Sequence, residues 1–111
     1  MTAKEWLSQY PALNAKALYL MEKPETPEMM EQLKAAHEKM QAIEDAINAV
    51  QDDELSEVLY LRYLEGPTGR LMPWKDVSQA MYGGDSEKDI LRTYRRHRLA
   101  LEAVQIPLEA V

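Results

Sequence analysis

A short stretch near the C-terminus concentrates the side chains best suited to chemistry. Within eleven residues it has five cations and a single acid, Asp89. The cations are Lys88, Arg92, Arg95, Arg96 and Arg98. Ammonium and guanidinium groups bind phosphate oxygens, and the arginine fork also fits the edge of a guanine base. The stretch therefore predicts a polyanion-binding surface, although a solvated helix face paired with acids elsewhere in the chain explains the same residues.

Other reactive side chains are isolated. The chain has no cysteine and two histidines. His97 falls on an apolar helix stripe, which predicts a packed, hydrogen-bonded core residue, and His37 has no second metal ligand at a useful spacing. The sequence has no phosphate-binding glycine loop, and helix capping explains the acidic run 52–54. We therefore expect no enzymatic activity, no metal site and no cofactor.

Composition predicts the kind of fold that positions these residues. The chain has 111 residues, 46% of them hydrophobic, with seven Met and no Phe. Helix-forming residues dominate and β-branched residues are few, so the predicted class is all-α. The N-terminus lacks the pattern of a signal peptide, and no apolar run reaches the ~20 residues of a membrane span. We expect a cytoplasmic protein with no membrane partner.

Charge is divided unevenly along the chain. Residues 1–65 have six Lys/Arg and thirteen Asp/Glu, a net charge of −7, and residues 66–111 have seven and six, a net charge of +1. The total of −6 argues against indiscriminate DNA binding, because phosphate attraction drives non-specific association. Any DNA-binding surface must therefore be local and C-terminal.

Residues 1–51 predict an antiparallel helical hairpin. The first helix covers about 3–22, and Pro11 is expected to kink it without shifting its apolar stripe. Thr26 is the expected N-cap of a second helix, over about 27–50. The first stripe is Trp6, Tyr10, Leu13, Ala17 and Leu20, and the coiled-coil-like seam of the second helix is Met29, Leu33, Ala36, Met40, Ile43, Ile47 and Val50. Pairing of this seam within the chain is the ordinary interpretation, and a homodimer through these helices is the alternative.

Residues 52–111 predict three helices, over about 53–65, 73–82 and 86–106. Gly66 is the expected C-cap of the first, and Asp85 or Ser86 the N-cap of the last, which Pro107 ends. Leu71 and Met72 are expected to reach the core and Arg70 the solvent; Arg62 is expected to be structural. The predicted core residues are Trp74, Val77, Ala80 and Met81, then Ile90, Tyr94, His97, Leu101 and Val104. A helical wheel places Lys88, Arg92 and Arg95 opposite the last stripe, with Arg96 and Arg98 on its flanks.

The last two helices, joined at Gly83-Gly84, have the order of a DNA-binding helix-turn-helix. The motifs Leu61-Arg62-Tyr63-Leu64-Glu65-Gly66 and Trp74-Lys75-Asp76-Val77-Ser78, followed by an arginine-rich helix, resemble sigma factor region 4. The opening 4–10, with Leu13-Asn14 and Tyr94-Arg95-Arg96-His97, resembles small phage and prophage regulators of the ArpU/RinA type. This resemblance implies a sigma region-4-like unit over 52–111 in a transcriptional regulator working in a bacterial host.

The expected partner is double-stranded DNA. Phosphate contacts are assigned to Lys75, Arg95, Arg96 and Arg98, base-edge contacts to Lys88 and Arg92, and a supporting donor to Ser86. Two alternatives stay open. One is a region-4 mimic that binds RNA polymerase with little DNA contact, which the acidic net charge favours; the other is a small terminase-like packaging component.

Overall fold

The protein folds entirely into helices. The structure, a computed structural model, describes residues 1–22 and 26–110, and this part of the chain has no strand, which confirms the all-α prediction. The helices are α1 (Ala3–Leu7), α2 (Tyr10–Glu22), α3 (Pro27–Asn48), α4 (Asp53–Leu59), α5 (Trp74–Tyr82) and α6 (Glu87–Ala103). A π-helical turn, η1 (Tyr60–Leu64), continues α4, and a 3-10 turn, η2 (Leu108–Ala110), follows α6. None of the described helices is long and apolar enough to span a bilayer.

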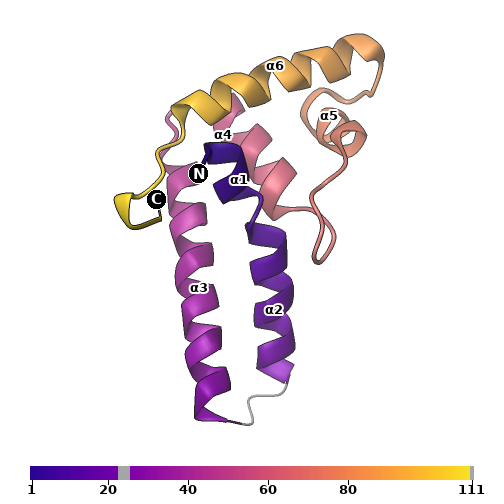
Figure 1. The fold of residues 1–111 in the computed structure, drawn as a ribbon. Coiled ribbons are helices and arrows are strands. Elements are labelled where there is room, and N and C mark those ends of the chain that lie inside the picture. The colour runs from indigo at the N-terminus through magenta and orange to yellow at the C-terminus, as the bar shows by residue number, and fades with distance from the viewer. Residues whose placement is uncertain (23–25, 111) are drawn as a thin grey trace.

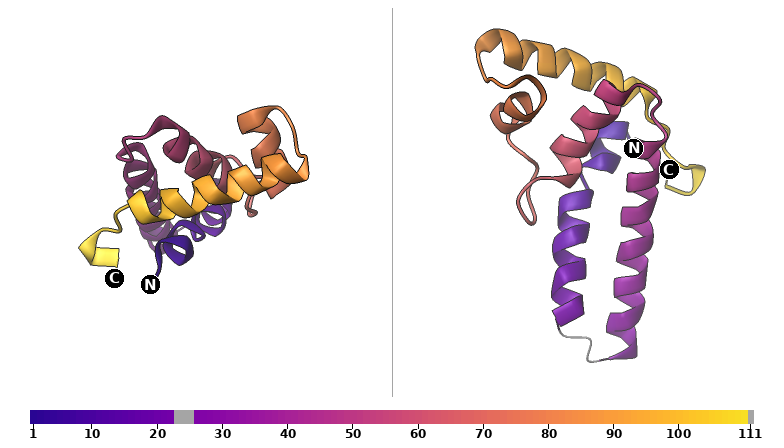
Figure 2. Two further views of the ribbon diagram at one scale, coloured as in Figure 1. Left: turned by 90° about the horizontal axis from the view of Figure 1, so that it is seen from above. Right: turned by 180° about the vertical axis from the view of Figure 1, so that it is seen from behind.

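The molecule is an elongated stalk with a helical head. Helices α2 and α3 run antiparallel and form the stalk, and α6 lies across the opposite end (Figure 1). Helix α4 lies beneath α6, and α5 packs against α6 and η1 at one side of the head (Figures 1 and 2). The principal dimensions are 50 × 28 × 20 Å. This arrangement exposes the outer face of α6 at the end of the molecule farthest from the stalk tip (Figure 1).

The first helical segment is split, not kinked. Helix α1 ends at Leu7 and α2 begins at Tyr10, so the prediction of one continuous kinked helix is wrong. Pro11 has no N–H to donate, and the chain places it in the first turn of α2, where no donor is needed. The Ser8 N–H and hydroxyl both donate to the Lys4 carbonyl, at 2.9 and 2.6 Å, which closes α1. Trp6 and Tyr10 stay buried on either side of the break, so the apolar stripe keeps its phase.

Helix α3 satisfies its apolar seam within the chain. Thr26 caps it as predicted, its hydroxyl accepting from the Met29 N–H at 3.1 Å. The seam faces inward: Ala36, Ile43, Ile47 and Val50 are buried, and Met29, Leu33 and Met40 are half-buried. Tyr10 donates a hydrogen bond of 3.0 Å to Glu44, which joins the two stalk helices. The hairpin within the chain is therefore the arrangement seen.

Gly66 is required by close packing and not by a left-handed cap. The backbone φ of Gly66 is not positive, so Gly66 does not form the left-handed glycine cap that its predicted C-cap position implies. A Cβ at Gly66 would lie 2.4 Å from the Arg70 carbonyl oxygen and 2.6 Å from the Met72 nitrogen. The 66–73 loop thus folds back directly onto the end of η1. As predicted, Leu71 and Met72 pack against the core while Arg70 is exposed.

Helix α5 ends in a tight turn held by a buried serine. Ala80 is exposed, contrary to the prediction, and Ser78 is fully buried in its place. The Ser78 hydroxyl donates to the Gly84 carbonyl at 2.6 Å, which fixes the turn into α6. Gly83 has a φ of 76°, the left-handed conformation that commonly ends a helix. The α5–α6 connection is therefore defined by both backbone and side chain.

Helix α6 is rotated about its axis relative to the prediction. Its buried residues are Thr93, His97, Ala100 and Val104, whereas Tyr94 is 44% exposed. Thr93 and Ala100, which have short side chains, thus lie on the buried face of α6 where longer residues were expected. The helix also ends earlier than predicted, at Ala103, with Val104 already extended.

Candidate nucleic-acid interface

The α5–α6 unit presents the seven predicted contact residues in different settings. Lys75 is exposed on α5, and Lys88, Arg95 and Arg98 are exposed on α6. Arg92 and Arg96 contact Glu54 on α4, with side chains that stay 56% and 41% exposed, and Ser86 is the N-cap of α6. The structure thus divides the basic cluster into an outward set without a carboxylate partner and an inward set, Arg92 and Arg96, that shares Glu54.

The inward set is held by one carboxylate. Glu54 Oε1 on α4 lies 3.0 Å from Arg96 Nε and 4.0 Å from Arg92 Nη2, and it accepts a 2.7 Å hydrogen bond from the Tyr82 hydroxyl. The Arg92 guanidinium lies 4.1 Å from the centre of the Tyr82 ring. Burial and the hydrogen bond to Glu54 raise the pKa of Tyr82 to about 12, so its hydroxyl remains a donor. A base-edge contact by Arg92 would require its guanidinium to leave this cluster.

The sequence alone does not indicate that Glu54 binds Tyr82, Arg92 and Arg96, because helix capping explains the whole acidic run 52–54. Asp52 is the actual cap, accepting from the Leu55 N–H at 3.0 Å. No local pattern links Glu54 to a helix some forty residues later. The available signal was a chain-wide one: an acidic first half and a basic stretch in the second.

Loss of this carboxylate should loosen the head. We expect Glu54→Gln to lower the free energy of unfolding by about 1–2 kcal/mol, since it removes the negative charge that Tyr82 and Arg96 contact directly and that Arg92 approaches at 4.0 Å. Glu57→Gln is the matched control, because Glu57 is exposed on the same helix. Chemical denaturation of both variants measures the difference. Equal stabilities would show that the clamp contributes nothing.

The outward set forms a cationic face. Lys88, Arg95 and Arg98 are exposed along roughly 15 Å of α6, with Lys88 and Arg95 opposite His97 and Arg98 beside them. In the part of the chain that the structure describes, no carboxylate lies within ion-pairing distance of them. Their charges are therefore available to an external anion. We call these three residues the outward cationic face.

The acidic residues in the first turn of α6 oppose the binding of an anion less than their number indicates. The Asp89 carboxylate accepts the Ser86 hydroxyl at 2.8 Å, and the Asp89 N–H donates back to Ser86 Oγ at 3.3 Å. A Cβ at Gly84 would lie 2.8 Å from this carboxylate, so glycine makes room for it. Asp89 and Ser86 thus serve the cap, and Glu87 is the exposed acid of the turn.

A buried polar cluster fixes the orientation of α6. Tyr63 on η1 and His97 Nε2 share a 2.7 Å hydrogen bond, and both are buried. The Trp74 ring lies edge-on to two other rings, with 4.6 Å between the ring centres of Trp74 and His97 and 5.1 Å between those of Trp74 and Tyr94. Burial, with the charges of Arg62 and Lys4, lowers the pKa of His97 to about 4, so the ring is neutral at neutral pH. The prediction of a packed, hydrogen-bonded His97 is confirmed.

Arg62 is structural, as expected, and its hydrogen-bond partner lies in the 66–73 loop. Its Nη1 donates to the Met72 carbonyl at 2.6 Å, and its guanidinium lies 4.2 Å from the centre of the Trp74 ring. Burial lowers the pKa of Arg62 from its ordinary value. Among the described residues its buried Nε has no hydrogen-bond partner. Arg62 therefore joins η1, the 66–73 loop and α5.

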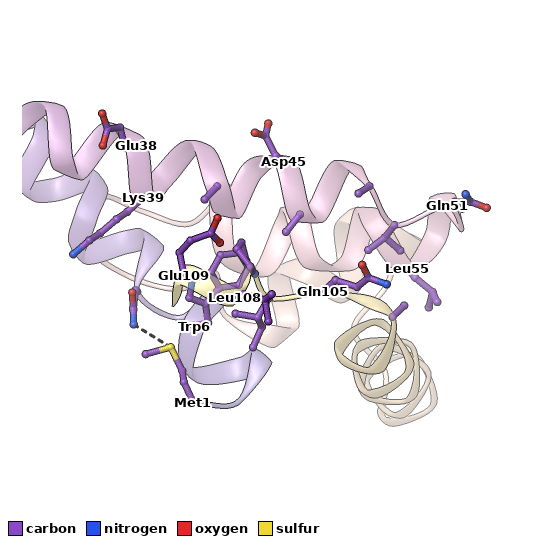
Figure 3. Close-up of a pocket in the computed structure, with 18 of the residues that line it drawn as sticks. Met1, Trp6, Glu38, Lys39, Asp45, Gln51, Leu55, Gln105, Leu108 and Glu109 are labelled. Atoms are coloured by element: carbon purple, nitrogen blue, oxygen red, sulfur yellow. Dashed lines mark hydrogen bonds between the residues drawn. The ribbon is translucent and has the colours of Figure 1, made fainter. Parts of the chain in front are cut away.

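A groove lies between α3, α1 and the C-terminal segment (Figure 3). This groove has a volume of about 1520 Å³, and α3 lines it with alanine and charged residues in equal number. Its charged lining residues are Glu38, Asp45, Asp52 and Glu109, against Lys39. An acidic groove repels phosphates, so the outward cationic face remains the candidate interface.

Comparison with protein-family models, with curated proteins and with solved structures gives no match for this chain.

Proposed function

We propose that this protein is a phage- or prophage-derived transcriptional regulator that binds duplex DNA through the outward cationic face. The observation that supports this most is the division of the basic cluster. Arg92 and Arg96 share one carboxylate, Glu54, while Lys88, Arg95 and Arg98 are exposed at the end of the molecule and have no carboxylate within ion-pairing distance among the described residues. A purely structural cluster would have carboxylate partners for most of its cations.

The proposed contacts follow from position along α6. Lys88 lies in the first turn, the part of a recognition helix that reaches base edges. Arg95 and Arg98 lie farther along the same face and would bind phosphates, with Lys75 on α5 as a fourth cation. In this proposal Arg92 and Arg96 position α6 and do not read the DNA.

Few phosphate contacts imply modest affinity for DNA of arbitrary sequence. Four neutralised phosphates correspond to a slope of about −3.6 for the logarithm of the binding constant against that of salt concentration. The net charge of −6 weakens binding further away from the specific site. The protein should therefore select a sequence and not coat DNA.

Selection from a pool of randomised duplexes tests the proposal. We expect repeated rounds of binding to enrich a common motif, and the enriched duplex then serves as a defined ligand. A pool without enrichment at low salt would contradict DNA recognition.

On the enriched duplex, Arg95→Ala should lower affinity about tenfold and reduce the salt slope by about 1. The loss arises because one cation leaves the face without affecting the clamp. Lys39→Ala is the matched control, since Lys39 is an exposed cation on the stalk. Fluorescence anisotropy measures both. An unchanged salt slope for Arg95→Ala would remove this residue from the interface.

Binding to RNA polymerase is the second candidate, and one observation favours it. Leu91, Tyr94 and Leu99 are 47%, 44% and 43% exposed on α6, among the cations. Exposed apolar residues of this size fit a protein surface better than a phosphate backbone. Tight binding of purified bacterial RNA polymerase, together with no enriched DNA motif, would favour a region-4 mimic.

A further inference from the structure

The groove between α3, α1 and the C-terminal segment has an apolar lining. This lining includes the buried residues Trp6 and Val50 and the half-buried residues Leu55 and Ile106. Leu108 lines the same groove but is 90% exposed, more than any other large apolar residue in the described part of the chain. An apolar hollow with an uncovered leucine beside it is typical of a surface that binds a partner.

The α3 side of the groove has the spacing of a helix-packing seam. Steps of four, three, four and three residues connect its lining residues Ala35, Lys39, Ala42, Ala46 and the C-cap Ala49. This alternation keeps the residues on one face of the helix. The short alanine side chains let a second helix approach α3 closely, because the distance between packed helices depends on the side chains at the contact. The core-facing residues Ala36, Ile43 and Ile47 lie on a different face.

Carboxylates follow this seam along one edge. Glu38, Asp45 and Asp52 line the groove at steps of seven residues, which is also the repeat of the seam. Glu38 and Asp45 lie one after the other along the outer edge of α3 (Figure 3). Glu109 adds a fourth negative charge from the C-terminal segment, and Lys39 is the single cation among the described lining residues. Four negative charges and one positive charge favour a cationic partner.

We propose that this groove binds a basic amphipathic helix of a partner protein. The apolar stripe of that helix packs on the alanine seam, with Leu108 against its side. Lysine or arginine side chains one heptad apart pair with Glu38 and Asp45. The seam from residue 35 to residue 49 is about 21 Å long, which accommodates about four turns of the partner helix. The proposal is independent of DNA binding, because the outward cationic face is not part of the groove.

A designed peptide of defined chemistry tests the proposal. The probe is a fluorescein-labelled peptide of about 20 residues, with alanine and leucine at steps of three and four and one lysine per heptad beside them. A second peptide has glutamate in place of each lysine. Fluorescence anisotropy with the full chain should give a dissociation constant of roughly 10 μM for the lysine peptide and at least ~20-fold weaker binding of the glutamate peptide. Equal binding of the two peptides, or no binding of the lysine peptide, overturns the proposal.

Charge reversal in the groove separates a defined contact from general attraction of a cation to an acidic protein. Asp45→Lys should weaken binding of the lysine peptide about tenfold and strengthen binding of the glutamate peptide. Glu57→Lys makes the same charge change at an exposed position of α4 outside the groove, and it should change the affinity less than about twofold. Circular dichroism confirms that both variants are folded. Equal weakening by the two substitutions overturns the proposal.

Leu108→Ala tests the apolar part of the contact without affecting the fold, since Leu108 is 90% exposed. We expect about fivefold weaker binding of the lysine peptide, because a leucine that the peptide would bury is lost. Leu91→Ala is the matched control, since Leu91 is an exposed leucine of α6 outside the groove. Equal affinities of the two variants would overturn the contact with the C-terminal segment.

Sedimentation equilibrium of the full chain distinguishes a foreign partner from a second copy. Lys88 and Arg95 are one heptad apart on α6, so α6 of another molecule is the alternative occupant of the groove. We expect the chain alone to remain monomeric at the concentrations where the lysine peptide binds. Self-association that Asp45→Lys abolishes would assign the groove to a second copy and overturn the proposal of a foreign partner.

Discussion

Replacing Gly66 with alanine should lower the free energy of unfolding by about 3 kcal/mol or more. The added Cβ would lie 2.4 Å from the Arg70 carbonyl oxygen and 2.6 Å from the Met72 nitrogen. Both neighbours are backbone atoms, and Met72 is held in place by its N–H bond to the Arg62 carbonyl at 3.1 Å. Overpacking that a side chain cannot relieve is at the upper end of the usual 1–3 kcal/mol. For a domain of this size the melting temperature should fall by roughly 15 °C.

Gly83→Ala is the matched control for this prediction. Gly83 has a φ of 76° but open space around the position of a Cβ, so alanine meets only backbone strain. That strain costs about 1 kcal/mol. Thermal melting of the two variants should therefore rank Gly66→Ala well below Gly83→Ala. Equal losses would show that the loop at Gly66 can move away.

Acidification should destabilise the protein by about 3 kcal/mol through His97 alone. Burial, assisted by the charges of Arg62 and Lys4, lowers the pKa of His97 from 6.5 to about 4. The unfolded chain therefore takes up a proton at His97 below pH 6.5, while the folded chain does not. Stability is complete above pH 6.5 and is lost progressively as the pH falls toward 4. Urea denaturation at a series of pH values measures this slope.

His97→Gln should abolish this contribution while preserving a hydrogen-bond acceptor for the Tyr63 hydroxyl. The variant will be less stable at neutral pH because Gln packs less well against Trp74, but its stability should depend less on pH between 6.5 and 4. His37→Gln is the control, since His37 is exposed on α3. Parallel pH profiles for wild type and His97→Gln would contradict the assignment.

Much of the fold could be predicted because it depends on local signals. The apolar stripe of 6–20 and the seam of 29–50 have helical spacing, and both face the core. Thr26 precedes Pro27 in the order that starts a helix, and it caps α3. Patterns of this kind are decided within one or two turns, so the helix positions were accurate to a few residues.

The remaining features depend on contacts between distant segments. The rotation of α6 buries Thr93 and Ala100 in place of Tyr94, which no periodicity of α6 alone reveals. The inward turn of Arg92 and Arg96 depends on Glu54, a residue on a different helix. A helical wheel places Arg92 on the outer face, and its side chain is 56% exposed there, but a wheel treats α6 as an isolated helix and does not show the contact with Glu54. Such a wheel identifies a basic helix but not which of its cations are free.

Chemical-shift mapping by nuclear magnetic resonance can show directly which cations of the basic cluster bind DNA. Labelled protein is titrated with the enriched duplex while backbone amide shifts are followed along the whole chain. We expect the largest shift changes at Lys88, Arg95 and Arg98, with a further change at Lys75 and little change in the stalk. Shift changes confined to the stalk, or absent from the exposed face of α6, would contradict it.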